Sequence, residues 1–270
     1  MKPVLVGAVI YDPKVAVIWD IIARYFSAQG CPIDCVYYTN YELMVTALVE
    51  RHIDIAWNSP LAWVDAERRT KGGCRAIAMR DTDRDRVSHF IVDKAKGWRS
   101  LSQLRGATVA TGALDSPQAT LSPLQVLRRE GLQPGRDFTQ RRFDVLVGKH
   151  GDHVGGERDA LEALKKGEAQ ACCVLDLNWQ LWSSDGTIDG SKFEVLATTP
   201  RFDHCNFTVL GSFDAAREAA WTKVLMSMSY ENPAHREMMD LEGLKAWLPG
   251  RTSGYAVLEE ACRDQKFFER

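Results

Sequence analysis

Short apolar runs alternate with helix-like segments over the first 70 residues, and this alternation is the strongest constraint on the fold. The runs at residues 4–10, 33–38 and 53–57 have the length of strands, and each is followed by turn residues and a segment of helical period. This order is typical of a parallel sheet that is covered by helices on both faces. We therefore expect an α/β fold.

The pattern starts again near Ser100. Strand-like runs cover residues 107–111, 138–143 and 169–175, and helical segments lie between them. The spacing from the end of a helix to the next strand is the same in the two sets, which is the faint repeat that two similar lobes would leave. A chain of 270 residues is long enough for two such lobes.

A charged stretch at residues 80–86 separates two strand-like segments and indicates where the chain leaves the first lobe. We expect a discontinuous first lobe of residues 1–83 plus 204–270, and a second lobe of residues 84–203. Two crossing strands would then form a hinge on which the lobes open and close.

Charge and hydropathy argue against several classes of function. The net charge is −2 and no run of five like charges occurs, so non-specific binding to nucleic acid has no electrostatic support. No window of about 18 apolar residues is present, so we expect no membrane segment. The first apolar run is broken by Tyr11-Asp12-Pro13, and we interpret it as a strand rather than a secretion signal.

The number and spacing of the cysteines indicate the redox state of the compartment in which the protein works. Their number is odd, seven, and they form no C-x-x-C pair, which favours a reducing environment. Cys172 and Cys173 lie inside an apolar run, where cysteine acts as a small buried hydrophobic residue. The sequence as it stands therefore predicts a cytoplasmic protein, or a periplasmic one if a leader has been removed.

Ligands of open α/β sheets bind outside the carboxyl ends of the strands. Two of the loops at predicted strand ends open helices with a serine, whose neighbouring amides and helix dipole favour an anion. The same serines are equally explained as ordinary N-caps. The candidate ligand contacts from the strand-end loops are Tyr11, Tyr41, Asn58, Ser59, Thr111, Ser116, Gln118, His150 and Asp176.

Two further segments carry side chains that are suited to chemistry. The glycine-rich loop at 148–157 contains His150 and His153, which could contact an anion, act as weak candidate metal ligands, or only lie in solvent. His204 and Cys205 are candidate catalytic residues, because a histidine beside a cysteine can activate the thiol. His204 is also a candidate metal ligand, and a polar hinge with a part-buried cysteine explains this pair equally well.

Residues 48–63, Leu-Val-Glu-Arg-His-Ile-Asp-Ile-Ala-Trp-Asn-Ser-Pro-Leu-Ala-Trp, resemble the first-lobe signature of phosphonate/phosphate-type ABC-transporter solute-binding proteins. Residues 163–176 resemble its counterpart in the second lobe, and the order of elements fits over nearly the whole chain. The resemblance implies a two-lobed type II periplasmic-binding-protein fold with the ligand in the cleft between the lobes. It also implies ligand contacts from Tyr11, Asn58, Ser59, Thr111, Ser116 and His150.

One departure from that family is Asp115, whose carboxylate would repel a dianion held at the same loop. We expect the chain to bind a small, anionic organic ligand, phosphonate- or phosphate-related, as a solute-binding receptor, with an ABC permease as its partner if it is exported. The alternative is a cytoplasmic enzyme on the same fold that uses the histidines and Cys205 of the cleft. No cofactor is predicted, and a metal ion enters only with that alternative.

Overall fold

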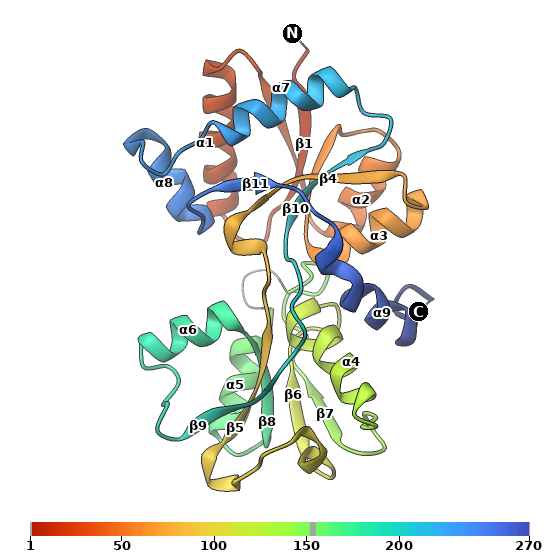
Figure 1. The fold of residues 1–270 in the computed structure, drawn as a ribbon, viewed down its shortest axis with the longest axis vertical. Coiled ribbons are helices and arrows are strands. Elements are labelled where there is room, and N and C mark those ends of the chain that lie inside the picture. Colours follow the sequence, from red (N-terminus) through yellow and green to blue (C-terminus); the bar gives the residue numbers. More distant parts are fainter. Residues whose placement is uncertain (1, 152–154, 270) are drawn as a thin grey trace. The chain divides into compact units, whose positions relative to one another are not determined.

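The computed structural model describes residues 2–151 and 155–269, which form two compact α/β units (Figure 1). The first unit contains the residues up to 84 together with 203–254, and the second contains residues 85–202 with the segment from 255 onward. The chain passes from one unit to the other three times, after residues 84, 202 and 254. Each unit has its own sheet and its own hydrophobic core.

The first unit is built on a six-stranded sheet with the order β11-β4-β10-β3-β1-β2. β1 pairs parallel with β2 and β3, whereas β10 is antiparallel to both β3 and β4. The strands are β1 (Val4–Val9), β2 (Ile33–Tyr38), β3 (Ile55–Asn58), β4 (Cys74–Arg80), β10 (Asn206–Leu210) and β11 (Trp247–Pro249). The helices are α1 (Lys14–Ala28), α2 (Tyr41–Val49), α3 (Pro60–Thr70), α7 (Ala215–Met226) and α8 (Pro233–Glu242), with a 3-10 turn η1 (Asp81–Asp83).

Hydrophobic spacing explains how these elements pack. In α1 the buried residues recur every three or four positions, from Val15 through Ile18 and Ile22 to Phe26, so one face of the helix meets the sheet. β3 is buried along its whole length, as expected for a central strand that is covered on both faces. Figure 1 shows α1 and α8 on one side of this unit and α2 and α3 on the other.

The second unit has a five-stranded sheet with the order β7-β6-β8-β5-β9. β6 pairs parallel with β7 and β8, and β5 is antiparallel to β8 and β9. The strands are β5 (Ser88–Asp93), β6 (Thr108–Thr111), β7 (Thr139–Arg142), β8 (Ala171–Leu175) and β9 (Phe193–Thr198). The helices are a π-helical turn η4 (Pro117–Leu121), α4 (Ser122–Arg129), α5 (Glu157–Lys165), α6 (Asp176–Ser184) and α9 (Ala256–Asp264). Short 3-10 turns are η2 (Lys94–Lys96), η3 (Leu101–Leu104), η6 (Ser253–Tyr255) and η7 (Phe267–Glu269).

The two sheets share one strand plan. The order β2-β1-β3-β10-β4 in the first unit corresponds to β7-β6-β8-β5-β9 in the second, with the fourth strand antiparallel in each. α2 precedes β3, and α5 precedes β8, which are the two helix–strand pairs whose spacing indicated a repeat. The expected two-lobed α/β fold is therefore confirmed.

The C-terminal helix differs from the expectation that residues 204–270 all belong to the first lobe. α9 packs on α4 in the second unit, where Nε2 of the buried Gln125 donates to Glu260 at 2.8 Å and to Asp264 at 2.7 Å. Helical periodicity identifies the apolar face of a helix but not the neighbour that covers it. We expected the chain to cross between the lobes twice. It crosses a third time, after residue 254.

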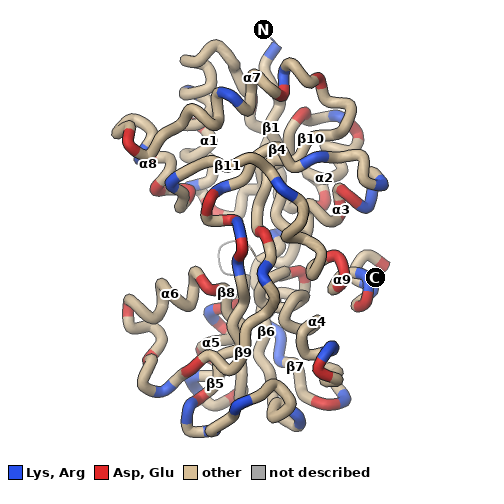
Figure 2. Tube along the Cα trace, viewed as in Figure 1, with Lys and Arg blue, Asp and Glu red and all other residues tan. Residues whose placement is uncertain are grey.

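Side chains of both charges are mixed along both units, in keeping with the small net charge (Figure 2). All seven cysteines are free thiols. Over residues 2–151 and 155–269, no helix combines the length and the apolar character that crossing a membrane requires.

Candidate functional site

In the first unit, β1, β2 and β3 run parallel, so their carboxyl ends lie at one edge of the sheet. Asn58 is the last residue of β3, and Ser59 is the N-cap of α3. The Ser59 hydroxyl oxygen accepts a hydrogen bond from the Ala62 amide at 3.1 Å. Asn58 and Ser59 are both fully buried, so the surrounding core fixes this strand-to-helix turn.

Asn58 belongs to a buried series of polar side chains. Its Nδ2 donates to Oγ1 of Thr208 at 2.8 Å, and that hydroxyl donates to Oδ1 of Asn206 at 2.6 Å. Strand pairing explains the contact, because Asn206 of β10 lies opposite Asn58 of β3. Oδ1 of Asn58 is buried and receives no hydrogen bond from any described residue. Such an acceptor is costly unless a ligand or water donates to it.

The two tyrosines predicted as ligand contacts lie in different environments. Tyr11 follows the first strand and packs, half-buried, against the core of the first unit. Tyr41 is the first residue of α2 and is almost fully buried, with 2% of its surface exposed. Tyr11 therefore keeps exposed surface near the strand ends, whereas Tyr41 contributes its ring to packing.

The second unit contains a similar serine-capped turn, after β6. β6 ends at Thr111, and the fully buried Ser116 is the N-cap of η4. The Ser116 hydroxyl oxygen accepts from the Ala119 amide at 3.1 Å, the same distance as in the first unit. Both turns carry the pattern Ser-Pro-x-Ala, at residues 59–62 and 116–119. The two turns share this pattern, although they follow strands at different places in the common plan, since β6 corresponds to β1 and β3 corresponds to β8.

A loop between β7 and α5 packs over the start of η4. The Gly148 amide donates to Oδ2 of Asp115 at 2.6 Å, and Nε2 of Gln118 donates to the carbonyl of Gly151 at 2.9 Å. Gly151 has a φ of +76° and lies so close to Ser116 that an added Cβ would overlap the hydroxyl oxygen. Position 151 therefore requires a glycine for this close approach.

Asp115 and Gln118 add unsatisfied acceptors to this turn. Both side chains are buried, and Oδ1 of Asp115 and Oε1 of Gln118 accept no hydrogen bond from the described part of the chain. Burial raises the pKa of Asp115, although the amide hydrogen bond from Gly148 opposes that rise. A helix N-terminus supplies donors and these two side chains supply acceptors, so the turn suits a ligand that carries both kinds of group.

His150 lies in the same loop, with a φ of +52° and a partly buried side chain. Burial lowers the pKa of His150 to about 3, so the imidazole is neutral at pH 7 and has one N–H to donate. An anion would therefore receive a hydrogen bond from His150 rather than a full positive charge. His153, the other histidine predicted in this loop, lies outside the described residues.

Asp176 marks a second strand end in the same unit. It follows β8, which lies beside β6 and is parallel to it, so Asp176 and Thr111 share one edge of the sheet. Nη1 of Arg86 lies 3.2 Å from Oδ2 of Asp176. Oδ1 of this 8%-exposed carboxylate is another buried acceptor that no described residue satisfies.

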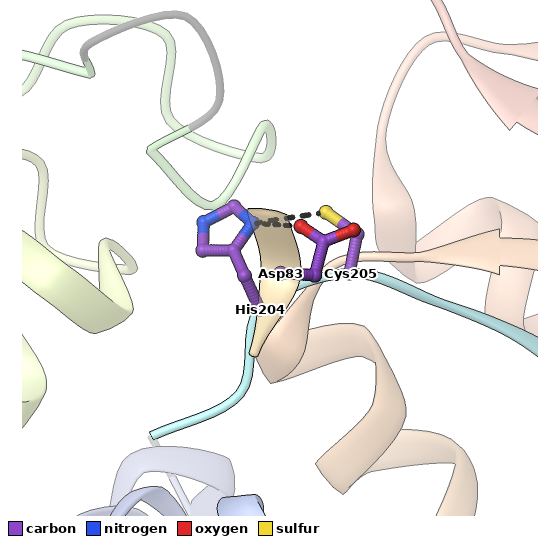
Figure 3. Close-up of side chains that lie close together, drawn as sticks. All are labelled: Asp83, His204 and Cys205. Carbon is purple, nitrogen blue, oxygen red and sulfur yellow. Dashed lines mark hydrogen bonds and ion pairs between the residues drawn. The ribbon is translucent and has the colours of Figure 1, made fainter. Parts of the chain in front are cut away.

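The predicted pair His204 and Cys205 is joined by a third residue that sequence reasoning missed, Asp83 (Figure 3). Nδ1 of His204 lies 3.1 Å from Sγ of Cys205 and 3.5 Å from Oδ1 of Asp83. Asp83 falls in the charged stretch that was interpreted as a polar break, yet it is 1% exposed. Its signal in the sequence is the Arg80–Asp83 spacing, which allows a local ion pair across one turn.

The geometry of this cluster bears on the catalytic hypothesis. In a thiol that is activated by a histidine and a carboxylate, the two ring nitrogens face different partners, the thiol on one side and the carboxylate on the other. Here the same nitrogen faces both Cys205 and Asp83, so the arrangement differs from a catalytic relay. His150, the other described metal candidate, takes no part in this cluster.

Two sheets with one strand plan, each with a buried, serine-capped turn at its strand ends, define the class of the protein. The class is the type II periplasmic-binding-protein fold. Over residues 10–255 the sequence matches the family described as "ABC transporter, phosphonate, periplasmic substrate-binding protein", and the chain belongs to that family.

Sequence relatives include the probable ABC transporter phosphite binding protein PhnD1 of Prochlorococcus marinus. It is 22% identical over 234 residues, which cover 83% of this chain and 75% of that protein. An uncharacterized protein of Haemophilus influenzae is 59% identical over 34 residues, which cover 13% of this chain and 48% of that protein. The first relative thus extends over most of the chain, and the second over a short segment.

Solved structures show the same fold. PhnD1 of Prochlorococcus marinus in complex with methylphosphonate superposes with a TM-score of 0.74 at 19% identity, covering 98% of each chain. The XAC2383 protein of Xanthomonas citri bound to ATP gives a TM-score of 0.73 at 17% identity, covering 100% of this chain and 98% of that one.

Family membership confirms the resemblance seen in the sequence and the role of a solute-binding receptor for a small molecule. The expected cytoplasmic location is not supported, because the family is described as periplasmic. The interpretation of the first apolar run as a strand is confirmed by β1.

Proposed function

We propose that the chain binds a small phosphorus oxyanion of the phosphonate or phosphite type. The observation that carries this proposal is the pair of buried Ser-Pro-x-Ala turns, one per unit, each following the carboxyl end of an inner strand, β3 in the first unit and β6 in the second. A helix N-terminus offers amide donors and the positive end of its dipole, which favour an oxyanion. The printed description of PhnD1, a phosphite binding protein solved with methylphosphonate, supports the same ligand chemistry.

The protonation state of the ligand follows from the buried acceptors. Oδ1 of Asn58, Oε1 of Gln118 and Oδ1 of Asp115 have no donor within the described residues. A fully deprotonated oxyanion brings only acceptors and would leave all three atoms unsatisfied, whereas a ligand with one P–OH group donates a hydrogen bond to one of them. We infer that the chain prefers a hydrogen phosphonate monoanion over a dianion. Asp115 thus becomes a source of selectivity rather than an obstacle to anion binding.

The remaining parts of the proposal concern place and partner. The family description supports a periplasmic location and transfer of the ligand to an ABC permease. The ligand contacts that we assign are Asn58 and Ser59 in the first unit and Thr111, Ser116, Gln118 and the neutral His150 in the second. Neither a cofactor nor an enzymatic step is needed for this role.

Isothermal titration calorimetry with two ligands of similar shape tests the proposal. Methylphosphonate has an ionisable P–OH group near neutral pH, whereas methanesulfonate carries one charge and no O–H donor. We expect heat of binding with methylphosphonate, and affinity at least about 10-fold lower for methanesulfonate, since a site with buried polar groups rejects a ligand that leaves them unpaired. Tighter binding of methanesulfonate would contradict the inference about the P–OH donor.

Two variants connect that binding to the turns. Asn58→Ala and Ser116→Ala should each weaken methylphosphonate binding about 10-fold or more, because each removes a buried polar group at a strand end. Ser100→Ala is the matched control: Ser100 precedes η3, away from both turns, and is exposed. Unchanged affinity in both site variants would exclude these turns as the ligand site.

A further inference from the structure

Three potential metal ligands from two distant chain segments converge in the first unit. Asp83 ends η1, while His204 and Cys205 lie just before β10. The carboxylate oxygen, the imidazole nitrogen and the sulfur all lie within 4.8 Å of one another, and Figure 3 shows His204 and Cys205 turned toward the same point as Asp83. Over residues 2–151 and 155–269 this is the one such group of three.

The backbone explains how two consecutive residues reach one point. On a regular strand, neighbouring side chains point to opposite faces, so His204 and Cys205 would diverge. Residues 203–205 are not in strand conformation, and the His204 amide donates to the carbonyl of Asp83 at 2.7 Å. This hydrogen bond places the irregular segment against η1 and brings all three side chains together.

The distances from the His204 nitrogen to the other two ligand atoms are close to those in a tetrahedral zinc site. Zinc lies about 2.0–2.3 Å from nitrogen, oxygen and sulfur ligands, which sets neighbouring ligand atoms about 3.4–3.6 Å apart in a tetrahedron. In the structure Nδ1 lies 3.1 Å from Sγ and 3.5 Å from Oδ1, and all three ligand atoms lie within 4.8 Å of one another. We propose that Asp83, His204 and Cys205 bind a divalent cation of the zinc type. A fourth tetrahedral position remains for water or another ligand.

The charges around the cluster favour a dication. Arg80 pairs with Asp83 and with Glu242, so one guanidinium stands against two carboxylates and leaves one negative charge when all three are ionised. Metal binding converts the Cys205 thiol to a thiolate and releases its proton, which adds a second negative charge. A divalent cation then neutralises the cluster. Arg80 also fixes the orientation of the Asp83 carboxylate, which is the role of an outer-shell partner in metal sites.

Metal binding has a mechanical consequence. Asp83 lies two residues before the chain enters the second unit at residue 85, and His204 follows its return at residue 203. The cation would therefore join the outgoing and returning segments within the first unit. Because it binds the folded protein, it should also raise the midpoint of thermal unfolding as its concentration increases.

Cobalt spectroscopy on the full chain tests the proposal. The reduced protein, stripped of metal with a chelator, is titrated with Co²⁺, which takes the place of zinc and reports its ligands by absorption. We expect tetrahedral d–d bands and a thiolate-to-cobalt charge-transfer band that saturate at one equivalent and disappear when Zn²⁺ is added. The absence of a thiolate band would overturn the proposal.

Variants assign the band to this cluster. Cys205→Ser should abolish the charge-transfer band, and His204→Gln should weaken cobalt binding about 10-fold or more. Cys74→Ser is the control, because Cys74 is also buried in the first unit but lies in β4 outside the cluster. His204 is partly exposed, so His204→Gln should keep the fold even if Cys205→Ser does not. A band that is lost in Cys74→Ser, or cobalt affinity unchanged in His204→Gln, would overturn the proposal.

Discussion

The Arg80 guanidinium binds the Asp83 carboxylate at two points, with Nε 2.7 Å from Oδ2 and Nη2 2.9 Å from Oδ1. Nη1 of Arg80 also donates to Glu242 at 2.9 Å, so one part-buried cation joins two carboxylates. Burial alone would raise the pKa of Asp83, but the charge of Arg80 outweighs it and holds that pKa well below its usual range. Asp83 is therefore ionised at neutral pH, and its low pKa depends on the Arg80 guanidinium.

Replacing Arg80 by methionine should destabilise the protein by about 3–5 kcal/mol, because the buried carboxylate of Asp83 and the part-buried carboxylate of Glu242 would lose their shared partner. The measurement is urea unfolding at neutral pH in the presence of a chelator. Arg24→Met is the control, since the Arg24–Asp20 pair is exposed and such pairs contribute about 0–1 kcal/mol. Equal losses in the two variants would show that burial does not govern the Arg80 pair.

Gly151→Ala should destabilise the loop over Ser116 and weaken ligand binding. Alanine would be strained at a φ of +76°, and its Cβ would overlap the Ser116 hydroxyl oxygen, so we expect a loss of about 1–3 kcal/mol. Gly30→Ala separates the two causes, because Gly30 has a φ of +73° but open space around it. Unfolding and ligand titration should show the smaller stability loss and unchanged affinity for Gly30→Ala. Similar effects at both positions would mean that only backbone strain matters.

Gln125→Ala should destabilise the second unit by about 1–3 kcal/mol, since the buried amide connects α4 to two carboxylates of α9. Amide hydrogen exchange in α9 should increase as well, because the helix loses its polar anchor. Gln180→Ala is the control, an exposed glutamine on α6 of the same unit. Unchanged exchange in α9 after Gln125→Ala would contradict the importance of this contact.

The sequence predicted the positions of strands well where hydrophobic runs were short and bounded by turn residues, but the parallel sheet it indicated was incomplete, because β10 and β5 run antiparallel to their neighbours. β1, β3 and β8 are apolar and buried, so their hydrophobic pattern identifies them as strands without knowledge of the neighbouring strands. β11 was missed because it has three residues and, among the described strands, pairs with β4 alone, so its existence depends on that partner. The partner of α9 was missed for the same reason.

The site residues show where local patterns stop being informative. The sequence pattern predicts Ser59 and Ser116 as helix N-caps. The structure confirms both caps and places them after β3 and β6. Nothing local indicates that Asn58 meets Thr208, because that contact depends on the pairing of β3 with β10 across 150 residues. The burial of Asp83 was not predicted, because it lies in a charged stretch and sequence composition does not distinguish a solvated charge from a buried ion pair.

The depressed pKa of His150 makes stability depend on pH. Burial lowers that pKa from 6.5 to about 3, so between these values the unfolded chain binds a proton that the folded chain does not. Acidification therefore favours the unfolded state, and the contribution of His150 to stability is complete above pH 6.5 and falls below it, by at most about 1.4 kcal/mol per pH unit. His150→Asn should reduce this loss, and asparagine tolerates the φ of +52°.

Urea unfolding of both proteins at pH 7.5 and pH 5 measures the effect as a difference of differences. Other groups titrate in this range, such as His89, whose pKa is lowered by burial, but they are common to both proteins and cancel. We expect wild type to lose more stability than His150→Asn on acidification, because only wild type carries the imidazole at position 150, whose pKa burial lowers. An identical loss in the two proteins would show that His150 becomes protonated as readily in the folded chain as in the unfolded one.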